Sequence, residues 1–189
     1  MTGNATQAAA TMAEMEDAAL RIERVEAIPV ALPLRKPMVM AGERIEFAAN
    51  LIVRIEAANG LVGWGEAASA PTMTGDLQAG MVAAVEQHLA PLLLGEDALG
   101  HAALARRCGH ALHGNGGAKS AVDMALLDLV GRHVRLPVCD LLGGALRSAV
   151  RPMWLLGNKT VEEDIAEAAD KRRAGFGFFK LKVGVKPVA

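Results

Sequence analysis

The chain has 189 residues, of which 52% are hydrophobic, 22% charged and only 3% aromatic, with a formal net charge of -1 at pH 7. This composition is that of a globular protein that can bury a core. Mixed, nearly balanced charge and the lack of tyrosine argue against a surface for nucleic acid or for an anionic membrane. We therefore expect neither nucleic acid nor a membrane as a partner.

Several features indicate a cytoplasmic protein. The opening residues 1–20, MTGNATQAAATMAEMEDAAL, carry acids where a signal peptide would carry Lys or Arg. We interpret them as a disordered or loosely helical extension, because their Ala and Glu content favours a short helix from Ala8 to Leu20. Cys108 and Cys139 fit no metal-ligand spacing and are expected to be free thiols. Apolar runs such as LAPLLLG are too short to span a bilayer.

Three strands are predicted next. The stretch RIERVEAIPVALPL begins an edge strand near Arg21, since its prolines cannot donate to a sheet ladder. A polar loop, RKPMVMAGERIEF, follows it. The stretch NLIVRIEAANGLVGWGEA predicts strands Leu51–Ala57 and Leu61–Glu66, joined at Asn59-Gly60, which is a strong hairpin signal. The sequence thus predicts a three-stranded antiparallel meander.

Helical periodicity follows the meander. The stretch DLQAGMVAAVEQHLAPLLLG predicts a helix that ends near Pro91 and Gly95. The stretch HAALARRCGHALHG predicts a second helix, ended by Gly114. The third helix, AKSAVDMALLDLVGRHV, has so broad an apolar stripe that burial on more than one side is expected.

The pattern changes again at Val150. VRPMWLLG predicts a short strand, and Thr160 with Glu163 forms a capping box that begins helix Val161–Ala174, which Gly175 ends. FFKLKVG predicts a further strand, so the unit is β-α-β with a parallel pair. One helix cannot cover both faces of such a pair. We therefore expect this unit to be the beginning of something larger.

Two lysines interrupt this last apolar strand. Lys180 and Lys182 point to one face of it, while Phe179 and Leu181 point to the other. Two ammonium groups on one buried face would be costly. The residues therefore leave two alternatives, a face open to solvent or a polar cavity that uses both charges.

A long motif lies in residues 118–144, AKSAVDMALLDLVGRHVRLPVCDLLGG. It resembles the signature of the mandelate racemase/muconate lactonizing enzyme family of the enolase superfamily. The residues in register are Ala118, Ser120, Ala121, Asp123, Ala125, Asp128, Gly131, Arg132, Pro137 and Leu141-Leu142-Gly143. GWGEA and KLKVG stand at the expected places on either side, so the resemblance covers nearly everything from Arg21 to Val185.

The resemblance implies an α+β capping domain, a three-stranded antiparallel meander plus helices, followed by the first β-α-β of an incomplete (β/α) barrel. Residues 21–149 would be the capping domain and residues 150–189 the start of the barrel domain. The chain therefore looks truncated, and a homo-oligomer is expected for the full-length protein.

The resemblance also gives both lysines a catalytic role. Lys182 would abstract a proton alpha to a carboxylate, or stabilise the enolate that results, in a small carboxylate substrate. Lys180 lies beside it, and because like charges disfavour double protonation, the pair favours a neutral amine that can act as a base. The family's cofactor is Mg²⁺ or Mn²⁺. Its acidic ligands would follow Ala189, so no metal ligand is expected within this chain.

Two loops are candidates for a substrate lid. They lie near Met38–Glu43 and Thr72–Gly75, and the resemblance makes them segments that close on substrate and set specificity. Flexible methionines suit that use. The alternative is that both are ordinary connections, and individual substrate-binding residues stay unknown.

Other polar residues favour plain structural roles. HGNGGAKS lacks the glycine that a phosphate loop needs directly before Lys119, so a helix-entry loop is expected. His110 and His113 have no third ligand to make a metal site. Glu66 could touch substrate, but a strand-end carboxylate hydrogen-bonded to the backbone is favoured.

The function expected is that of an isomerase, either a muconate-type cycloisomerase or a racemase/epimerase. Two alternatives stay open. One is an acid-sugar dehydratase, a lyase of the same superfamily. The other is an inactive truncated remnant or assembly domain, and the 189-residue chain alone is expected to be inactive.

Overall fold

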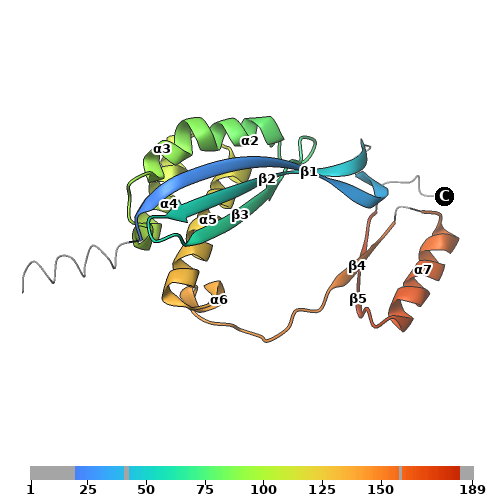
Figure 1. The fold of residues 1–189 in the computed structure, drawn as a ribbon. Coiled ribbons are helices and arrows are strands. Elements are labelled where there is room, and N and C mark those ends of the chain that lie inside the picture. Colours follow the sequence, from blue (N-terminus) through green and yellow to red (C-terminus); the bar gives the residue numbers. More distant parts are fainter. Residues whose placement is uncertain (1–19, 41–42, 158, 184–189) are drawn as a thin grey trace, which may run out of the picture. The chain divides into compact units, whose positions relative to one another are not determined.

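The computed structural model describes residues 20–40, 43–157 and 159–183 (Figure 1). The chain divides into two compact units between Gly144 and Ala145. The domain limits 21–149 and 150–189 suggested by the sequence stay a prediction, and the expected helix from Ala8 lies outside the described residues except for Leu20. None of the helices in the described part of the chain has the length and hydropathy that a membrane span requires.

The first unit contains the predicted antiparallel meander. Strands β1 (Ile22–Met40), β2 (Glu43–Ala57) and β3 (Val62–Ala68) lie in the order β1-β2-β3. The turn between β2 and β3 contains Gly60 at φ +80°, and the Asn59 side chain accepts a hydrogen bond from the Leu61 N–H at 3.1 Å. Here the hairpin forms where the Asn-Gly pair predicts it.

The prediction of a polar loop between the first two strands is wrong. After a register shift between Pro33 and Met38, pairing resumes, with Met38 opposite Ile45 and Met40 opposite Glu43. The two strands therefore continue as a β-hairpin arm. Alternating apolar and charged side chains in this stretch suit a strand that is solvated on one face, a pattern that its charge content obscured. The shift falls where two prolines interrupt the ladder.

The predicted helices are all present, with one difference. The first consists of α2 (Gln78–Ala84), a π-helical turn (Val85–Leu89) and α3 (Ala90–Leu93) in direct succession. Pro91 lies in the first turn of α3, and because proline lacks an N–H and clashes with the carbonyl four residues earlier, the wider π turn accommodates it.

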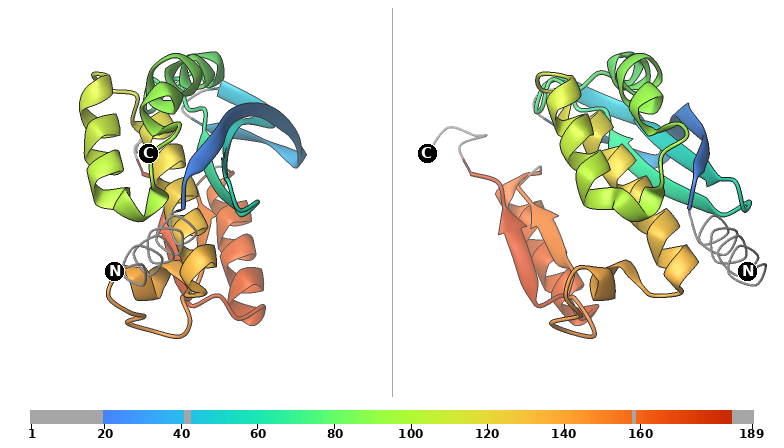
Figure 2. Two further views of the ribbon diagram at one scale, coloured as in Figure 1. Left: turned by 60° about the vertical axis from the view of Figure 1, so that its left-hand side comes forward. Right: turned by 90° about the vertical axis from the view of Figure 1, so that its left-hand side faces the viewer.

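The remaining helices of this unit are α4 (His101–Ala111), α5 (Gly116–Val134) and the short α6 (Val138–Leu141). Figures 1 and 2 show helices α2 to α5 on one face of the sheet. Helix α5 lies directly against β3 and β2, which explains its broad apolar stripe. Its fully buried residues are Ala118, Ala121, Val122, Ala125, Leu126 and Leu129.

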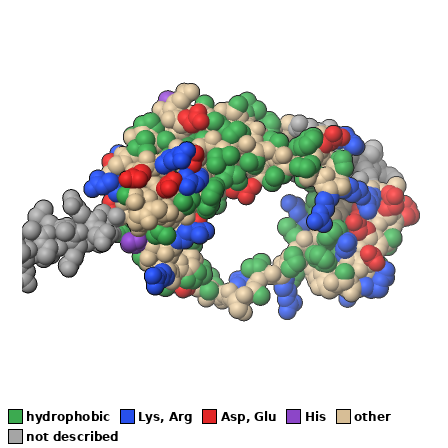
Figure 3. Space-filling view, in the orientation of Figure 1, with side chains coloured by type: hydrophobic (Ala, Val, Ile, Leu, Met, Phe, Trp, Pro, Cys, Tyr) green, Lys and Arg blue, Asp and Glu red, His purple; other side chains and the backbone are tan. Residues whose placement is uncertain are grey.

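The second unit is the predicted β-α-β. Strands β4 (Met153–Leu156) and β5 (Phe178–Leu181) pair in parallel, and helix α7 (Val161–Arg173) connects them. The capping box is formed, because the Thr160 side chain accepts from the Glu163 N–H while the Glu163 carboxylate accepts from the Thr160 N–H. In the view of Figure 3, basic and acidic side chains are interspersed, in line with the mixed charge of the sequence.

Candidate active site

The pairing of β4 with β5 decides which way Lys180 faces. Lys180 is the register partner of Leu155, and Phe179 is the partner of Trp154. Partners in a parallel ladder share a face, and neighbours along a strand alternate between faces. Trp154 lies on the α7 side, because Lys171 Nζ is 3.9 Å from the centroid of its ring system. Lys180 therefore lies on the face opposite α7.

Lys182 follows directly after β5 and extends the ladder. Its N–H donates to the Leu156 carbonyl at 3.1 Å, so the alternation of the strand places Lys182 on the same face as Lys180. Lys182 is half-buried, whereas Lys180 is exposed. The structure thus brings both predicted lysines to one face, at the carboxyl end of a parallel strand, while their chemical roles stay a prediction.

Apolar side chains share that face with the lysines. Met153 and Phe178 are register partners there, and they are 58% and 55% exposed. Burying a large apolar side chain fully stabilises a protein by about 1.5–3 kcal/mol. A layer of protein that covered Met153 and Phe178 would therefore stabilise this unit. Within the described residues this face is open to solvent, and the choice between a solvated face and a polar cavity stays a prediction.

Described residues of both predicted lid segments line one cavity in the first unit. This cavity, of about 270 Å³, opens between the β1–β2 arm and the segment that follows β3. Met38 comes from one segment and Thr72 and Met73 from the other. The complete lining is Leu34, Met38, Ile45, Phe47, Ala48, Ala49, Asn50, Ala68, Ser69, Ala70, Pro71, Thr72 and Met73. A role in substrate binding stays a prediction.

The second lid segment is a closed loop. The Ala70 N–H and the Ser69 hydroxyl both donate to the Asp76 carbonyl at 3.1 Å, which joins the two ends of the loop. The Thr74 N–H donates to the Ala70 carbonyl at 2.9 Å. These bonds hold Thr72 and Met73 at the tip of a compact turn rather than in an extended connection.

Glu66 makes a different contact from the one predicted. Its carboxylate accepts a hydrogen bond from the side-chain amide of Asn50 on β2, not from the backbone. The Asn50 carbonyl accepts in turn from the Gln78 side chain at 2.7 Å, which also donates to the Val30 carbonyl at 2.7 Å. Sequence reasoning missed this network, because its members come from three strands and a helix.

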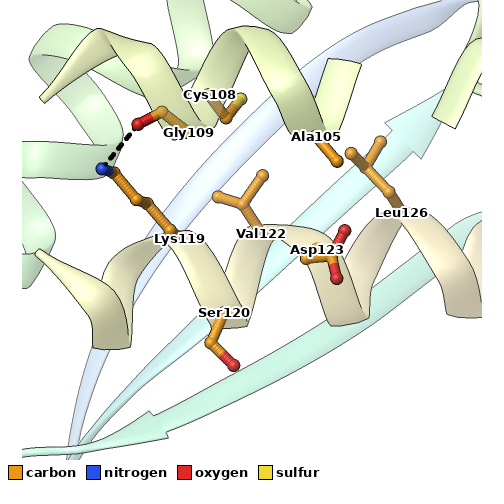
Figure 4. Close-up of a pocket in the computed structure, with 8 residues that line it drawn as sticks. All are labelled: Ala105, Cys108, Gly109, Lys119, Ser120, Val122, Asp123 and Leu126. Atoms are coloured by element: carbon orange, nitrogen blue, oxygen red, sulfur yellow. Dashed lines mark hydrogen bonds between the residues drawn. The ribbon is translucent and has the colours of Figure 1, made fainter. Parts of the chain in front are cut away.

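The HGNGGAKS segment connects two helices, as expected. Lys119 Nζ donates to the Gly109 carbonyl at 2.9 Å, at the C-terminal end of α4 (Figure 4). It also donates to the Leu112 carbonyl, at the cap of the same helix. A lysine there satisfies carbonyls that the helix leaves without a partner. A cavity of about 330 Å³ lies between α4 and α5, and both Lys119 and Cys108 line it. Burial raises the pKa of the Cys108 thiol.

Within the described residues, no group of three or more His, Cys, Asp or Glu side chains could hold a metal ion. His110 lines a separate surface pocket beside α4. The signature residue Asp128 has a structural contact, because its carboxylate accepts from the Trp64 N–H at 3.0 Å and from Arg132 Nε at 2.9 Å. Asp128 thereby joins α5 to β3.

Residues 22–143 match the family model of the mandelate racemase/muconate lactonizing enzyme N-terminal domain. The chain therefore belongs to this family, and the expected fold class is confirmed.

Among characterised proteins, the chain is 36% identical over 170 residues to the L-Ala-D/L-Glu epimerase of Bacillus subtilis, covering 90% of this chain and 46% of the epimerase. It is 35% identical over 173 residues to a chloromuconate cycloisomerase of Pseudomonas putida, with the same two shares of 90% and 46%. The chain thus spans less than half the length of these relatives, which are isomerases by name.

Solved structures give the same result. The substrate-liganded L-Ala-D/L-Glu epimerase from Bacillus subtilis superposes with a TM-score of 0.81 at 36% identity, over 88% of this chain and 46% of that one. The muconate lactonizing enzyme from Pseudomonas fluorescens, complexed with muconolactone, superposes with a TM-score of 0.82 at 32% identity, over 89% of this chain and 46% of that one.

Proposed function

We propose that this chain forms the capping domain and the first barrel strands of an isomerase that abstracts a proton alpha to a carboxylate. The observation that carries this proposal is the ladder of β4 and β5. It puts Lys180 and Lys182 on one face, opposite α7, at the carboxyl end of the strands. Active sites of (β/α) barrels lie at that end.

The proposed base is Lys182. In its neutral form the amine takes a proton from the alpha carbon, the C–H bond breaks, and the electron pair delocalises into the adjacent carboxylate. The positive charge of Lys180, two residues away on the same face, would stabilise the negative charge that develops. Return of a proton to the carbon completes an epimerisation. In a cycloisomerisation, addition of a carboxylate oxygen to a carbon–carbon double bond would close the ring and form the enolate in place of the proton abstraction, and protonated Lys182 would then give its proton to the alpha carbon.

The lid cavity supplies the proposed specificity. Met38 and Met73 are exposed side chains that face it from different segments, and methionine adapts its shape to a ligand. We assign to this cavity the choice among small carboxylate substrates. The relatives' names suggest two classes to test, dipeptides and muconate-type diacids.

A divalent metal, Mg²⁺ or Mn²⁺, is part of the proposal for the whole enzyme, as is assembly into a homo-oligomer. The described residues offer no cluster that fits such an ion, so its ligands would come from elsewhere. When bound, the metal would supply positive charge to the carboxylate of the substrate. The steps assigned to this chain's residues use Lys182 and Lys180 alone.

The test uses the product of the complete reading frame that contains these 189 residues. It is incubated in D₂O with L-Ala-L-Glu and, separately, with muconolactone, and alpha-proton exchange is followed by NMR. We expect exchange with at least one substrate and a loss of about 10²–10⁴-fold in Lys182→Met, because the base is removed. Lys180→Met should retain more exchange than Lys182→Met, since it keeps the base.

Lys171 provides the matched control. It is a lysine of the same unit, but it lies on the α7 side against Trp154. Lys171→Met should leave the exchange rate near that of the unaltered protein. Normal exchange in Lys182→Met would show that the base is assigned wrongly and that the lysine face is merely solvated.

A further inference from the structure

Gly157 lies directly after β4, against the proposed base. It is buried, and its φ of +102° is a conformation that side chains rarely adopt. A Cβ added at Gly157 would lie 2.7 Å from the carbonyl oxygen of Lys182, 2.9 Å from its backbone nitrogen and 3.0 Å from its Cβ. These atoms belong to the backbone and the root of the side chain, so a flexible side-chain tip cannot relieve the overlap.

The Lys182 backbone is also fixed from the neighbouring residue. Its N–H donates to the carbonyl of Leu156, which precedes Gly157. Lys182 thus lies past the last regular pair of the strand, Leu156 with Leu181, with one hydrogen bond and one close backbone contact to hold it. Both come from the two residues at the end of β4.

A positive φ alone does not explain this contact. Gly175, in the same unit, has a nearly equal φ of +97°, but a Cβ there would meet nothing within 4 Å. The two glycines therefore share the backbone requirement and differ in their surroundings. At Gly157 the missing side chain makes room for Lys182.

We propose that Gly157 is a positioning residue that sets the place of Lys182. This inference rests on the proposed function, because it gives the position of Lys182 a catalytic purpose. Any side chain at 157 would push the Lys182 backbone by several tenths of an ångström. Catalytic groups need to be held within about 0.5 Å of their productive positions, so such a shift would lower turnover without removing the base.

The experiment compares Gly157→Ala with Gly175→Ala in the product of the complete reading frame. Both variants introduce a methyl group at a similar φ, so both carry the same backbone strain, and Gly157→Ala should lose more thermal stability because its methyl group also overlaps Lys182. Only Gly157→Ala should slow alpha-proton exchange, by about 10- to 100-fold, with little change in KM. Amide hydrogen exchange at Lys182 gives a direct structural readout, and it should be faster in Gly157→Ala and unchanged in Gly175→Ala.

Each other outcome contradicts the inference. Equal turnover in the two variants would show that Gly157 does not act through Lys182. If Gly157→Ala fails to fold while Gly175→Ala folds, glycine at 157 is a requirement of the fold and not a positioning device. Unchanged amide exchange at Lys182 would overturn the inference even if turnover fell.

A separate measurement, the turnover of Lys182→Met, tests the proposed function. Normal turnover in Lys182→Met would reject Lys182 as the base whatever Gly157→Ala does. Loss of turnover in Lys182→Met, together with equal behaviour of the two alanine variants, would reject only the role of Gly157.

Discussion

Gly63 and Gly65 allow β3 to approach α5 with no side chains between the two backbones. A Cβ on Gly63 would overlap the Ala125 carbonyl oxygen, and one on Gly65 would overlap the Ala121 carbonyl oxygen. Trp64 lies between these glycines, and its N–H donates to Asp128. The GWG stretch and the small residues of α5 thus form one contact.

We predict that Gly65→Ala destabilises the protein by about 3 kcal/mol, because the added methyl group must push the α5 backbone away. The control is Gly109→Ala, in α4, where a Cβ would meet nothing within 4 Å. Alanine there should stabilise by about 0.5–1 kcal/mol through its higher helix propensity. Urea unfolding measures both changes. A Gly65→Ala variant as stable as the unaltered protein would contradict the close contact.

Helix α7 shows how an element is stabilised by its ends. None of its residues is fully buried, so packing alone gives it little support. Its first turn carries Glu162, Glu163 and Asp164, and its last turn carries Lys171, Arg172 and Arg173. Charges of these signs are favourable at the two ends of the helix dipole. The capping box at Thr160 adds specific hydrogen bonds to that arrangement.

For this helix we predict that Thr160→Ala lowers the stability of α7 by about 1 kcal/mol, since the Glu163 N–H loses its side-chain acceptor. Thr160→Ser keeps the hydroxyl and should behave like the unaltered protein. Amide hydrogen exchange along residues 161–173 measures the effect. Equal protection in the alanine and serine variants would mean that the cap contributes nothing.

On the scale of the whole molecule, the chain divides into two units joined by an exposed stretch. Residues 144–152 have no helix or strand, and all of them are exposed. The first unit has a continuous core of helix and sheet residues. In the second unit, Leu156 is the one buried large apolar residue among those described, and it is still 8% exposed. The two units should therefore resist unfolding to different extents.

Limited proteolysis can test this difference in the 189-residue chain. Trypsin should cut first after Arg147, because exposed segments without secondary structure are preferred sites. Arg151 lies in the same stretch but precedes Pro152, and trypsin cleaves such a bond poorly. The fragment that contains residues 22–143 should persist longer than the fragment that contains α7. Early cleavage within α4 or α5 would contradict the prediction.

Short sequence motifs predicted the elements whose hydrogen bonds join residues close together in the chain. Asn59-Gly60 predicted the hairpin and Thr160 with Glu163 the capping box, because the partners in each case lie within a few residues. The β1–β2 arm was missed, because its strands are held by pairs such as Met38 with Ile45 across a register shift. The π-helical turn before Pro91 was missed because helical periodicity does not report the hydrogen-bond spacing.

The residue pattern indicated the family, through the long signature that runs from α5 through α6, and it singled out Lys180 and Lys182 as the candidate pair. The folded structure was needed to show where the two lysines face, since that depends on the pairing of Lys180 with Leu155 and on the packing of α7 against Trp154. It also decided that Gly157 lies against Lys182. The paired residues of β4 and β5 are far apart in the chain, because a helix separates the two strands. The sequence around one strand therefore does not tell which residue of the other strand will lie beside it.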